Sequence, residues 1–227
     1  MIDGKIYCLP NIPMKTHLPS LSIIALLLTS PIAHSEQAST EFDYISGGFQ
    51  YTGLSHEFTS SHYLEDGKEG ANTADSLAGA YVNASWNFTH RLYLIGEANL
   101  SKRNQFHLSH HNAGVGFYQP VSPSLTLFAT LGIAHIELKQ SEGIEHKNLQ
   151  YSDSGTSAAV GLRYAPVDMW LVEPSFRTDQ FNNKFSEYRL GNVFNVSNNM
   201  KIEANFSYSK IDKYTMSSYQ LGVRYTY

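Results

Sequence analysis

Apolar and polar residues alternate at every second position over most of the chain from residue 41 onward. Successive side chains of a β-strand point to opposite faces, so this period predicts strands with one apolar and one polar face. In the last segment, Leu221, Val223 and Tyr225 fall on one face, whereas Gln220 and Arg224 fall on the other. The alternation predicts ten strands, near residues 41–53, 77–89, 91–101, 107–119, 124–138, 156–165, 168–180, 186–197, 199–211 and 218–227.

The connections between these strands alternate in length. Four are tight turns, at Thr89–His90, Gln119–Ser124, Ala165–Asp168 and Ser197–Asn199. Between them lie longer polar stretches, notably Ser55–Asp75 and Gln140–Gly155, and shorter ones at Lys102–Phe106, Phe181–Phe185 and Asp212–Met216. Consecutive antiparallel strands therefore place all tight turns at one end and all longer loops at the other, which is typical of a transmembrane β-barrel.

The polar face decides between a membrane barrel and a soluble one. Only 16% of the residues are charged, and the polar faces are mostly Ser, Asn, Gly, Thr and Gln. A face turned to water usually carries more charge, so we expect the apolar face to meet lipid and the polar face to line a lumen; a soluble β-barrel is the alternative. Backbone groups in lipid must bond to each other, so the sheet must close.

The predicted fold class is thus all-β, a closed antiparallel transmembrane barrel with short periplasmic turns and longer extracellular loops. A spanning strand needs about 9–11 residues, so ten strands use roughly 110 residues and leave enough chain for the connections. Eight strands are the alternative, because they would turn two well-patterned hairpins into loops. Bacterial barrels have an even number of strands.

The N-terminal region has the layout of a secretory signal peptide. Met14–His17 is a short positive segment, Leu18–Leu28 is mostly apolar, and Ala33–Ser35 supplies small residues before a cleavage point. The expected division of the chain is an extension before the true start at 1–13, a signal peptide at 14–35 and a barrel at 36–227. The single cysteine, Cys8, lies in the first of these, so the expected barrel has no disulfide.

Composition excludes two classes of protein. The chain has 16 Lys and Arg against 20 Asp and Glu, a net charge of −4, which is not the basic balance of a nucleic-acid binder. The second excluded class is the helical membrane protein. The longest apolar run of the chain is Ile23–Leu28, far short of the ~20 residues of a spanning helix.

The last seven residues, Leu221–Tyr227, resemble the targeting signal of bacterial outer-membrane proteins. The resemblance lies in a hydrophobic residue, a glycine and a terminal aromatic-x-aromatic group, here Leu221, Gly222, Tyr225 and Tyr227. The final residue is Tyr where Phe is commoner. Residues 41–227 resemble small OmpA/OmpX-type outer-membrane barrels in pattern. The resemblance implies a monomer in the outer membrane of a Gram-negative-type cell, in contact with its lipid and lipopolysaccharide and inserted by the barrel-assembly machinery.

Charged residues of both signs fall on the predicted lumen face. They are Glu97, Arg163, Glu173, Arg177, Arg189, Lys201, Glu203 and Arg224. Unpaired charges in a confined space are costly, so we expect these residues to pair across the lumen. An eight-stranded barrel is filled by its side chains, and ten strands leave two alternatives: a salt-bridged plug and a narrow passive pore for small solutes or ions.

Histidines gather near the expected extracellular rim. His107, His110 and His111 begin one strand, His135 lies near the end of the next, and His146 follows in the loop. Imidazoles bind divalent metals, but His110 points away from the other two of its strand, and no carboxylate or cysteine motif completes a site. We therefore expect no metal and no cofactor.

One constellation suggests hydrolysis. His107 and Ser109 share a strand face, and Glu137 could orient the imidazole as the base for a nucleophilic hydroxyl. Ser109–Gly114 is similar to the His-x-Ser-Asn-Ala-Gly stretch of lipid A 3-O-deacylases, small outer-membrane barrels that cut lipid at their outer surface. When Asn-Ala-Gly is aligned, however, the family's His falls on Ser109 and its Ser on His111.

The longest expected loop, 55–75, mixes acidic and aromatic residues and is a candidate contact for an extracellular partner. The sequence favours a non-enzymatic envelope or surface protein. Two alternatives stay open: the narrow pore, and a lipid A deacylase-like hydrolase that uses His107 and Ser109.

Overall fold

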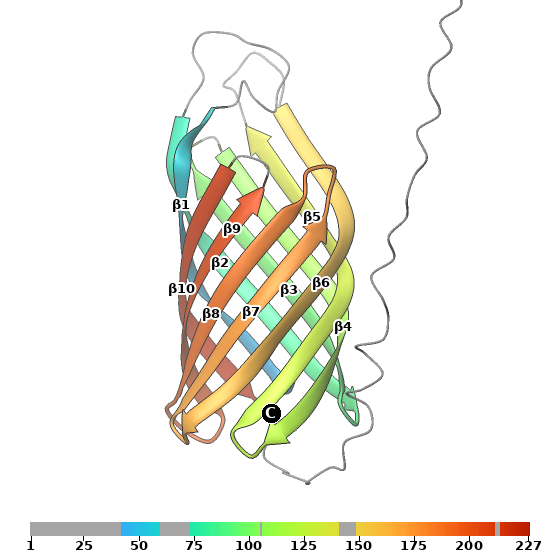
Figure 1. Cartoon of the computed structure of the whole chain (residues 1–227). Coiled ribbons are helices and arrows are strands. Elements are labelled where there is room, and N and C mark those ends of the chain that lie inside the picture. The colour runs from blue at the N-terminus through green and yellow to red at the C-terminus, as the bar shows by residue number, and fades with distance from the viewer. Residues whose placement is uncertain (1–41, 60–72, 105, 141–148, 212–213) are drawn as a thin grey trace, which may run out of the picture. The chain divides into compact units, whose positions relative to one another are not determined.

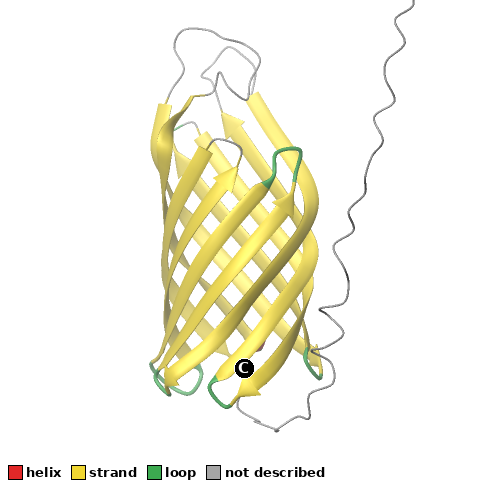
Figure 2. Cartoon of the chain, in the orientation of Figure 1, coloured by secondary structure: helices red, strands yellow, loops and turns green. Residues whose placement is uncertain are grey.

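The computed structural model describes residues 42–59, 73–104, 106–140, 149–211 and 214–227. These residues form ten antiparallel strands in a closed barrel (Figures 1 and 2). The strands are β1 (Tyr44–Thr59), β2 (Thr73–Thr89), β3 (Leu92–Arg103), β4 (Phe106–Ser122), β5 (Leu125–Gln140), β6 (Leu149–Val167), β7 (Trp170–Gln180), β8 (Phe185–Asn195), β9 (Met200–Ile211) and β10 (Tyr214–Thr226). The expected extension at 1–13 and signal peptide at 14–35 lie outside the described residues.

The barrel closes where its first strand pairs with its last. β1 and β10 are in register from the Tyr44–Thr226 pair to the Leu54–Met216 pair, and every other strand pairs with its sequence neighbours. Closure gives each strand a partner on both sides, which the absence of water in a bilayer requires. The ten-stranded antiparallel barrel predicted from the sequence is confirmed, and the eight-stranded alternative is wrong.

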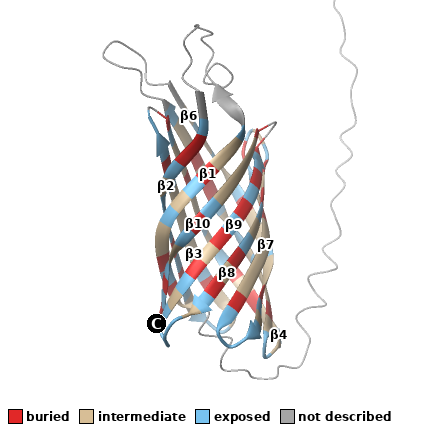
Figure 3. Ribbon diagram, turned by 90° about the vertical axis from the view of Figure 1, so that its left-hand side faces the viewer, coloured by how far each residue is buried: buried red, intermediate tan, exposed pale blue. Residues whose placement is uncertain are grey.

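The two strand faces differ in exposure as the alternation predicts. On β10, Leu221 is 61% exposed and Tyr225 is 44% exposed, whereas Gln220 and Arg224, the residue before each of them, are buried. The same alternation of exposed and buried positions follows the strands around the barrel (Figure 3). The apolar face is therefore the outer face, and the polar face lines the interior.

Aromatic side chains on the outer face gather near the tight-turn end. Trp86 and Phe88 lie close together on β2, with ring centroids 6.3 Å apart. Trp170 of β7 stacks on Phe194 of β8, with centroids 6.2 Å apart and planes 6° from parallel. Such a girdle is typical of barrels at the edge of the bilayer. Among the described residues, no helix is long and apolar enough to cross a membrane.

Several strands extend beyond the ranges that the alternation predicted. β1 continues to Thr59, and β6 begins at Leu149, which pairs with Gln140 of β5. The segment 149–155 was predicted as loop, and this was wrong because Tyr151 to Ser154 offer almost no apolar–polar contrast. The strands stay paired beyond the apolar band, but there the sequence no longer alternates between apolar and polar residues. Most of the predicted loop 55–75 lies outside the described residues.

The orientation of β10 generates a stability prediction. Leu221→Arg places a charge in lipid between the rings of Tyr219 and Tyr225, so it should lower the free energy of unfolding by about 2–4 kcal/mol. Thr215→Arg on the same outer face, at the extracellular end, should cost about 0–1 kcal/mol. Urea unfolding of the protein refolded into vesicles measures both. Equal losses would show that Leu221 does not lie deeper in the bilayer than Thr215.

Candidate functional site

The interior of the barrel is divided into layers along its axis. At the extracellular end lies an apolar cluster, formed by Ala134, Ile136, Phe181, Phe185, Ile211 and Tyr214. At the tight-turn end lies an aromatic cluster, formed by Phe42, Tyr93 and Tyr118, with Ile95 and Phe128 packed against it. The predicted polar interior is therefore only partly right, because apolar side chains close both ends of the charged middle.

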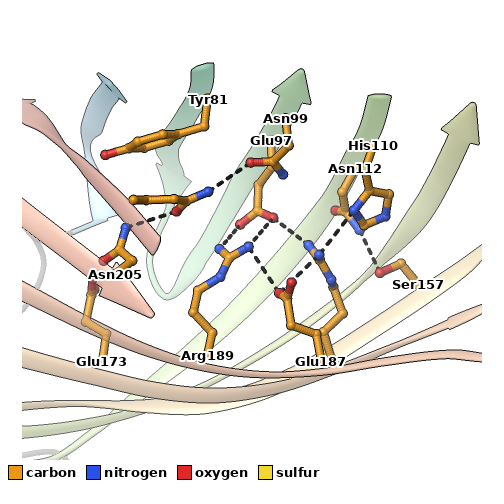
Figure 4. A network of polar contacts seen from close by, with 12 residues as sticks. Tyr81, Glu97, Asn99, His110, Asn112, Ser157, Glu173, Glu187, Arg189 and Asn205 are labelled. Atoms are coloured by element: carbon orange, nitrogen blue, oxygen red, sulfur yellow. Dashed lines mark hydrogen bonds and ion pairs between the residues drawn. The ribbon is translucent and has the colours of Figure 1, made fainter. Parts of the chain in front are cut away.

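One group of ion pairs in the middle is centred on Glu97 of β3. Its carboxylate lies 2.6 Å from Arg177 of β7 and 3.0 Å from Arg189 of β8, across the lumen (Figure 4). Glu187 lies 3.1 Å from each of the same two guanidiniums. All four side chains are at most 18% exposed. Asp179 adds a third carboxylate, 3.7 Å from Arg177, so three carboxylates neutralise two guanidiniums and join opposite walls.

A second group lies closer to the tight-turn end. Glu173 is 2.7 Å from Arg163 and 2.8 Å from Arg224, and Arg224 is 2.9 Å from Glu203. The Tyr81 hydroxyl donates a hydrogen bond of 2.7 Å to Glu203, which is fully buried. Each buried charge therefore has an opposite charge beside it, as a low-dielectric interior requires.

Aromatic faces and one glycine complete this second group. The Arg163 guanidinium lies 3.8 Å from the Phe42 ring centroid, and that of Arg224 lies 4.2 Å from the Tyr44 ring centroid, both within cation–π range. Gly222 points inward under Tyr81, and a Cβ at this position would clash with the Tyr81 hydroxyl. A glycine in the C-terminal signal is thus also what lets Tyr81 reach across the lumen.

The predicted lumen residues fall into three places. The first group holds Glu97, Arg177 and Arg189, and the second holds Arg163, Glu173, Glu203 and Arg224. Lys201 lines a vestibule of about 760 Å³ among the tight turns, which Arg163 of the second group also lines. Sequence reasoning missed Tyr81, Asp179 and Glu187. Tyr81 had a readable signal, a large aromatic on a face of small polar residues. Asp179 and Glu187 had one too, because each lies two positions from a predicted lumen residue, Arg177 or Arg189, and so shares its strand face.

His110 faces inward and joins a buried hydrogen-bonded chain. Its Nε2 lies 3.1 Å from the Asp179 carboxylate, and Ser157 donates to the same carboxylate at 2.6 Å. Asn112 in turn donates to Ser157 at 2.6 Å. Although these are the residue types of a hydrolytic triad, the serine hydroxyl bonds to the acid and not to the imidazole. No activated nucleophile results.

The candidate hydrolytic residues lie on the outer face, near the extracellular end. Ser109 of β4 is directly opposite Glu137 of β5, so the structure brings these two together. Glu137, however, lies 2.8 Å from Lys139. Within the described residues, His107 and Ser109 share no hydrogen bond. His107, Glu137 and Ser109 are thus close together, but they do not form the hydrogen-bonded chain of acid, base and nucleophile that hydrolysis requires.

The other histidines do not form a metal centre in the described part of the chain. His111 and His135 face each other across β4 and β5, with ring centroids 6.4 Å apart, and His135 Nδ1 lies 2.8 Å from the Ser154 hydroxyl. Over the described ranges, no group of three metal-ligating side chains converges. His146 lies outside those ranges.

Little space remains inside the barrel. A cavity of about 80 Å³ lies beside Glu97 and Arg163, and another of about 50 Å³ lies beside Gln50 and His110. Each holds a few water molecules at most. The interior that the structure describes is thus packed with side chains.

Comparisons with known proteins bear on the fold. No protein-family model matches the chain, and no curated protein matches it at a significant level. The translocator domain of autotransporter NalP from Neisseria meningitidis is similar with a TM-score of 0.51 and 14% identity, covering 84% of this chain and 92% of that one.

Two other solved structures are more distant in shape. Ail of Yersinia pestis has a TM-score of 0.41 and 17% identity, over 81% of this chain and 97% of that one. The outer membrane protease OmpT of Escherichia coli has a TM-score of 0.46 and 8% identity, over 82% and 97%. The similarity to the NalP translocator domain agrees with the closed β-barrel fold predicted from the sequence, and none of these comparisons assigns a narrower family.

The first ion-pair group generates a second stability prediction. Glu97→Gln removes the carboxylate that reaches both Arg177 and Arg189 from the opposite wall, so it should lower the free energy of unfolding by about 3–5 kcal/mol. Asp75→Asn breaks an exposed pair with Arg103 and should cost at most about 1 kcal/mol. Denaturant unfolding in vesicles compares the two variants, and an equal effect would mean that the buried group adds no stability.

Proposed function

We propose that the protein is a closed, non-conducting β-barrel of the bacterial outer membrane, with a non-enzymatic structural or surface-interaction role. The observation that carries this proposal is the layered interior: two groups of ion pairs lie between an apolar cluster and an aromatic cluster. A lumen filled in this way leaves the outer face and the extracellular end to make contacts.

The energetics favour the closed barrel over the narrow pore. Arg177 and Arg189 are each held by Glu97 and Glu187, and Arg224 is held by Glu173 and Glu203. A passing ion would have to separate such buried pairs, and leaving one buried charge without its partner costs about 3–5 kcal/mol. It would also have to displace the apolar side chains at both ends.

The C-terminal strand supports the proposed delivery by the barrel-assembly machinery. Tyr225 and Tyr227 of the signal point outward and stay accessible, while Gly222 points inward. β10 is also the strand that closes the barrel against β1. The same residues would therefore serve recognition before closure and packing after it. A monomer in contact with lipid and lipopolysaccharide, with an extracellular partner at the loop 55–75, remains part of the proposal.

The closed lumen predicts that the protein conducts no ions. In a planar bilayer, the refolded protein should show no reproducible single-channel steps, because the interior offers no continuous aqueous path. Folding and insertion are checked separately, by heat-modifiable mobility in gels and by β-sheet circular dichroism. Reproducible, ion-selective steps from protein that passes both checks would refute the closed lumen and favour the pore.

The outer-face geometry predicts that the protein leaves lipid A intact. Since Ser109 has no hydrogen-bonded base among the described residues, lipid A incubated with the refolded protein should keep all its acyl chains by mass spectrometry. Ser109→Ala serves as the matched variant. If the wild type removed an acyl chain and Ser109→Ala did not, the protein would be a hydrolase after all.

A further inference from the structure

The outer face of the barrel carries an extended group of polar side chains over β3, β4 and β5, whereas over β8, β9 and β10 a single polar row, Ser186, Lys210 and Thr215, lies at the extracellular end. Paired positions of β3, β4 and β5 form three rows there: Lys102, His107 and Lys139 in the top row, Ser109 and Glu137 in the middle row, and His111 and His135 in the bottom row. Partners in register point to the same face, so these seven side chains share one surface. We call it the outer polar ladder.

The ladder begins where the apolar band ends. On β5 the outward positions from residue 125 to residue 133 are all apolar. At about 3.3 Å per residue and a tilt of 35–45°, this run is about 20 Å tall, close to the ~25 Å band of an outer-membrane barrel. Each further outward position adds about 5 Å, so His135 lies at the upper edge of the band and Glu137 lies in the headgroup layer. Lys139 lies just above and can reach back into it.

The opposite side of the barrel is different. There the last outward aromatic residue toward the extracellular end is a tyrosine on each of four strands, namely Tyr51, Tyr188, Tyr208 and Tyr219. Tyrosine is the usual residue of an interfacial girdle. On β4 and β5 the first residues above the apolar band are instead His111 and His135. The girdle is therefore interrupted by hydrogen-bonding and cationic groups on one side.

The top row offers the donors that a phosphate group requires. Lys102 and Lys139 lie on strands two apart, so their backbones are about 10 Å apart, with His107 between them. Both lysine side chains are long enough to meet one group above the imidazole. The Lys139 ammonium forms an ion pair with the Glu137 carboxylate, with Nζ and Oε2 2.8 Å apart. Lys102 and Ser109 have no side-chain partner among the described residues. Ammonium groups and hydroxyls are good donors to phosphate oxygens.

We propose that the outer polar ladder binds the phosphate headgroup of an outer-leaflet lipid. The phosphate lies against Lys102, His107 and Lys139, with Ser109 below, and the acyl chains follow the apolar band past Ala113 and Ile133. A phosphate near two lysines gains from charge, and the apolar band directly below holds the rest of the molecule. The proposal extends the proposed function by naming a partner for the outer face; it does not depend on whether the lumen conducts.

The test counts lipids that stay bound. The refolded protein is placed in nanodiscs of phosphatidylcholine with a minor fraction of phosphatidic acid, and native mass spectrometry measures which lipids remain on the released barrel. We expect phosphatidic acid to be enriched roughly fivefold over its bulk fraction, as several exposed cation contacts of about 0.2–1 kcal/mol each would give. In the triple variant Lys102→Gln, His107→Gln, Lys139→Gln, the enrichment should fall to near one.

A matched control removes cations from the other side. Lys184→Gln with Lys210→Gln takes one positive charge from the residue before β8 and one from the extracellular end of β9, and it should keep the wild-type enrichment. The proposal is overturned if the triple variant, folded by gel mobility, keeps the enrichment, or if the control loses as much. Displacement of the lipid by an equal concentration of inorganic phosphate would also overturn it, because the site would then bind a free ion. Conductance of the same preparations reports on the closed lumen independently.

Discussion

The rest of the structure depends on one constraint: in a bilayer, the backbone N–H and C=O groups have no water to bond with. The pairing of β1 with β10 meets this constraint by removing both sheet edges. Once the sheet is closed, successive side chains of each strand point alternately to the outside and to the inside of the barrel. Every outward side chain then faces lipid or the headgroup layer, and every inward one must find a partner within a narrow cylinder.

The interior shows how that second requirement is met. Seven charged side chains of the predicted set pair with each other or with Glu187, so the middle of the barrel is neutralised locally. The contacts join strands that are far apart in the ring, such as β3 with β7 and β8. Buried pairs are costly to form and costlier to break, so they contribute to a specific arrangement more than to net stability.

The sequence predicted the strand number, the faces and the charged interior because each follows from the period of two and from residue type. It could not predict which charges meet, since Glu97 and Arg177 are 80 positions apart and their approach depends on strand tilt and stagger. It also missed the strand segment 149–155, where both faces are polar. Apolar interior residues such as Val193 were missed because alternation assigns apolar side chains to lipid, and the packing of the lumen ends overrides that rule.

The same geometry explains why contacts with other molecules belong to the outside. A filled interior makes the barrel a rigid support, and its outer face differs from one side to the other, with tyrosines over β8, β9, β10 and β1 and the outer polar ladder over β3, β4 and β5. A rigid cylinder with a uniform girdle has no preferred orientation toward its neighbours in the membrane. The proposed lipid site over β3, β4 and β5 would give it such a preference, because Lys102 and Lys139 both lie on that side.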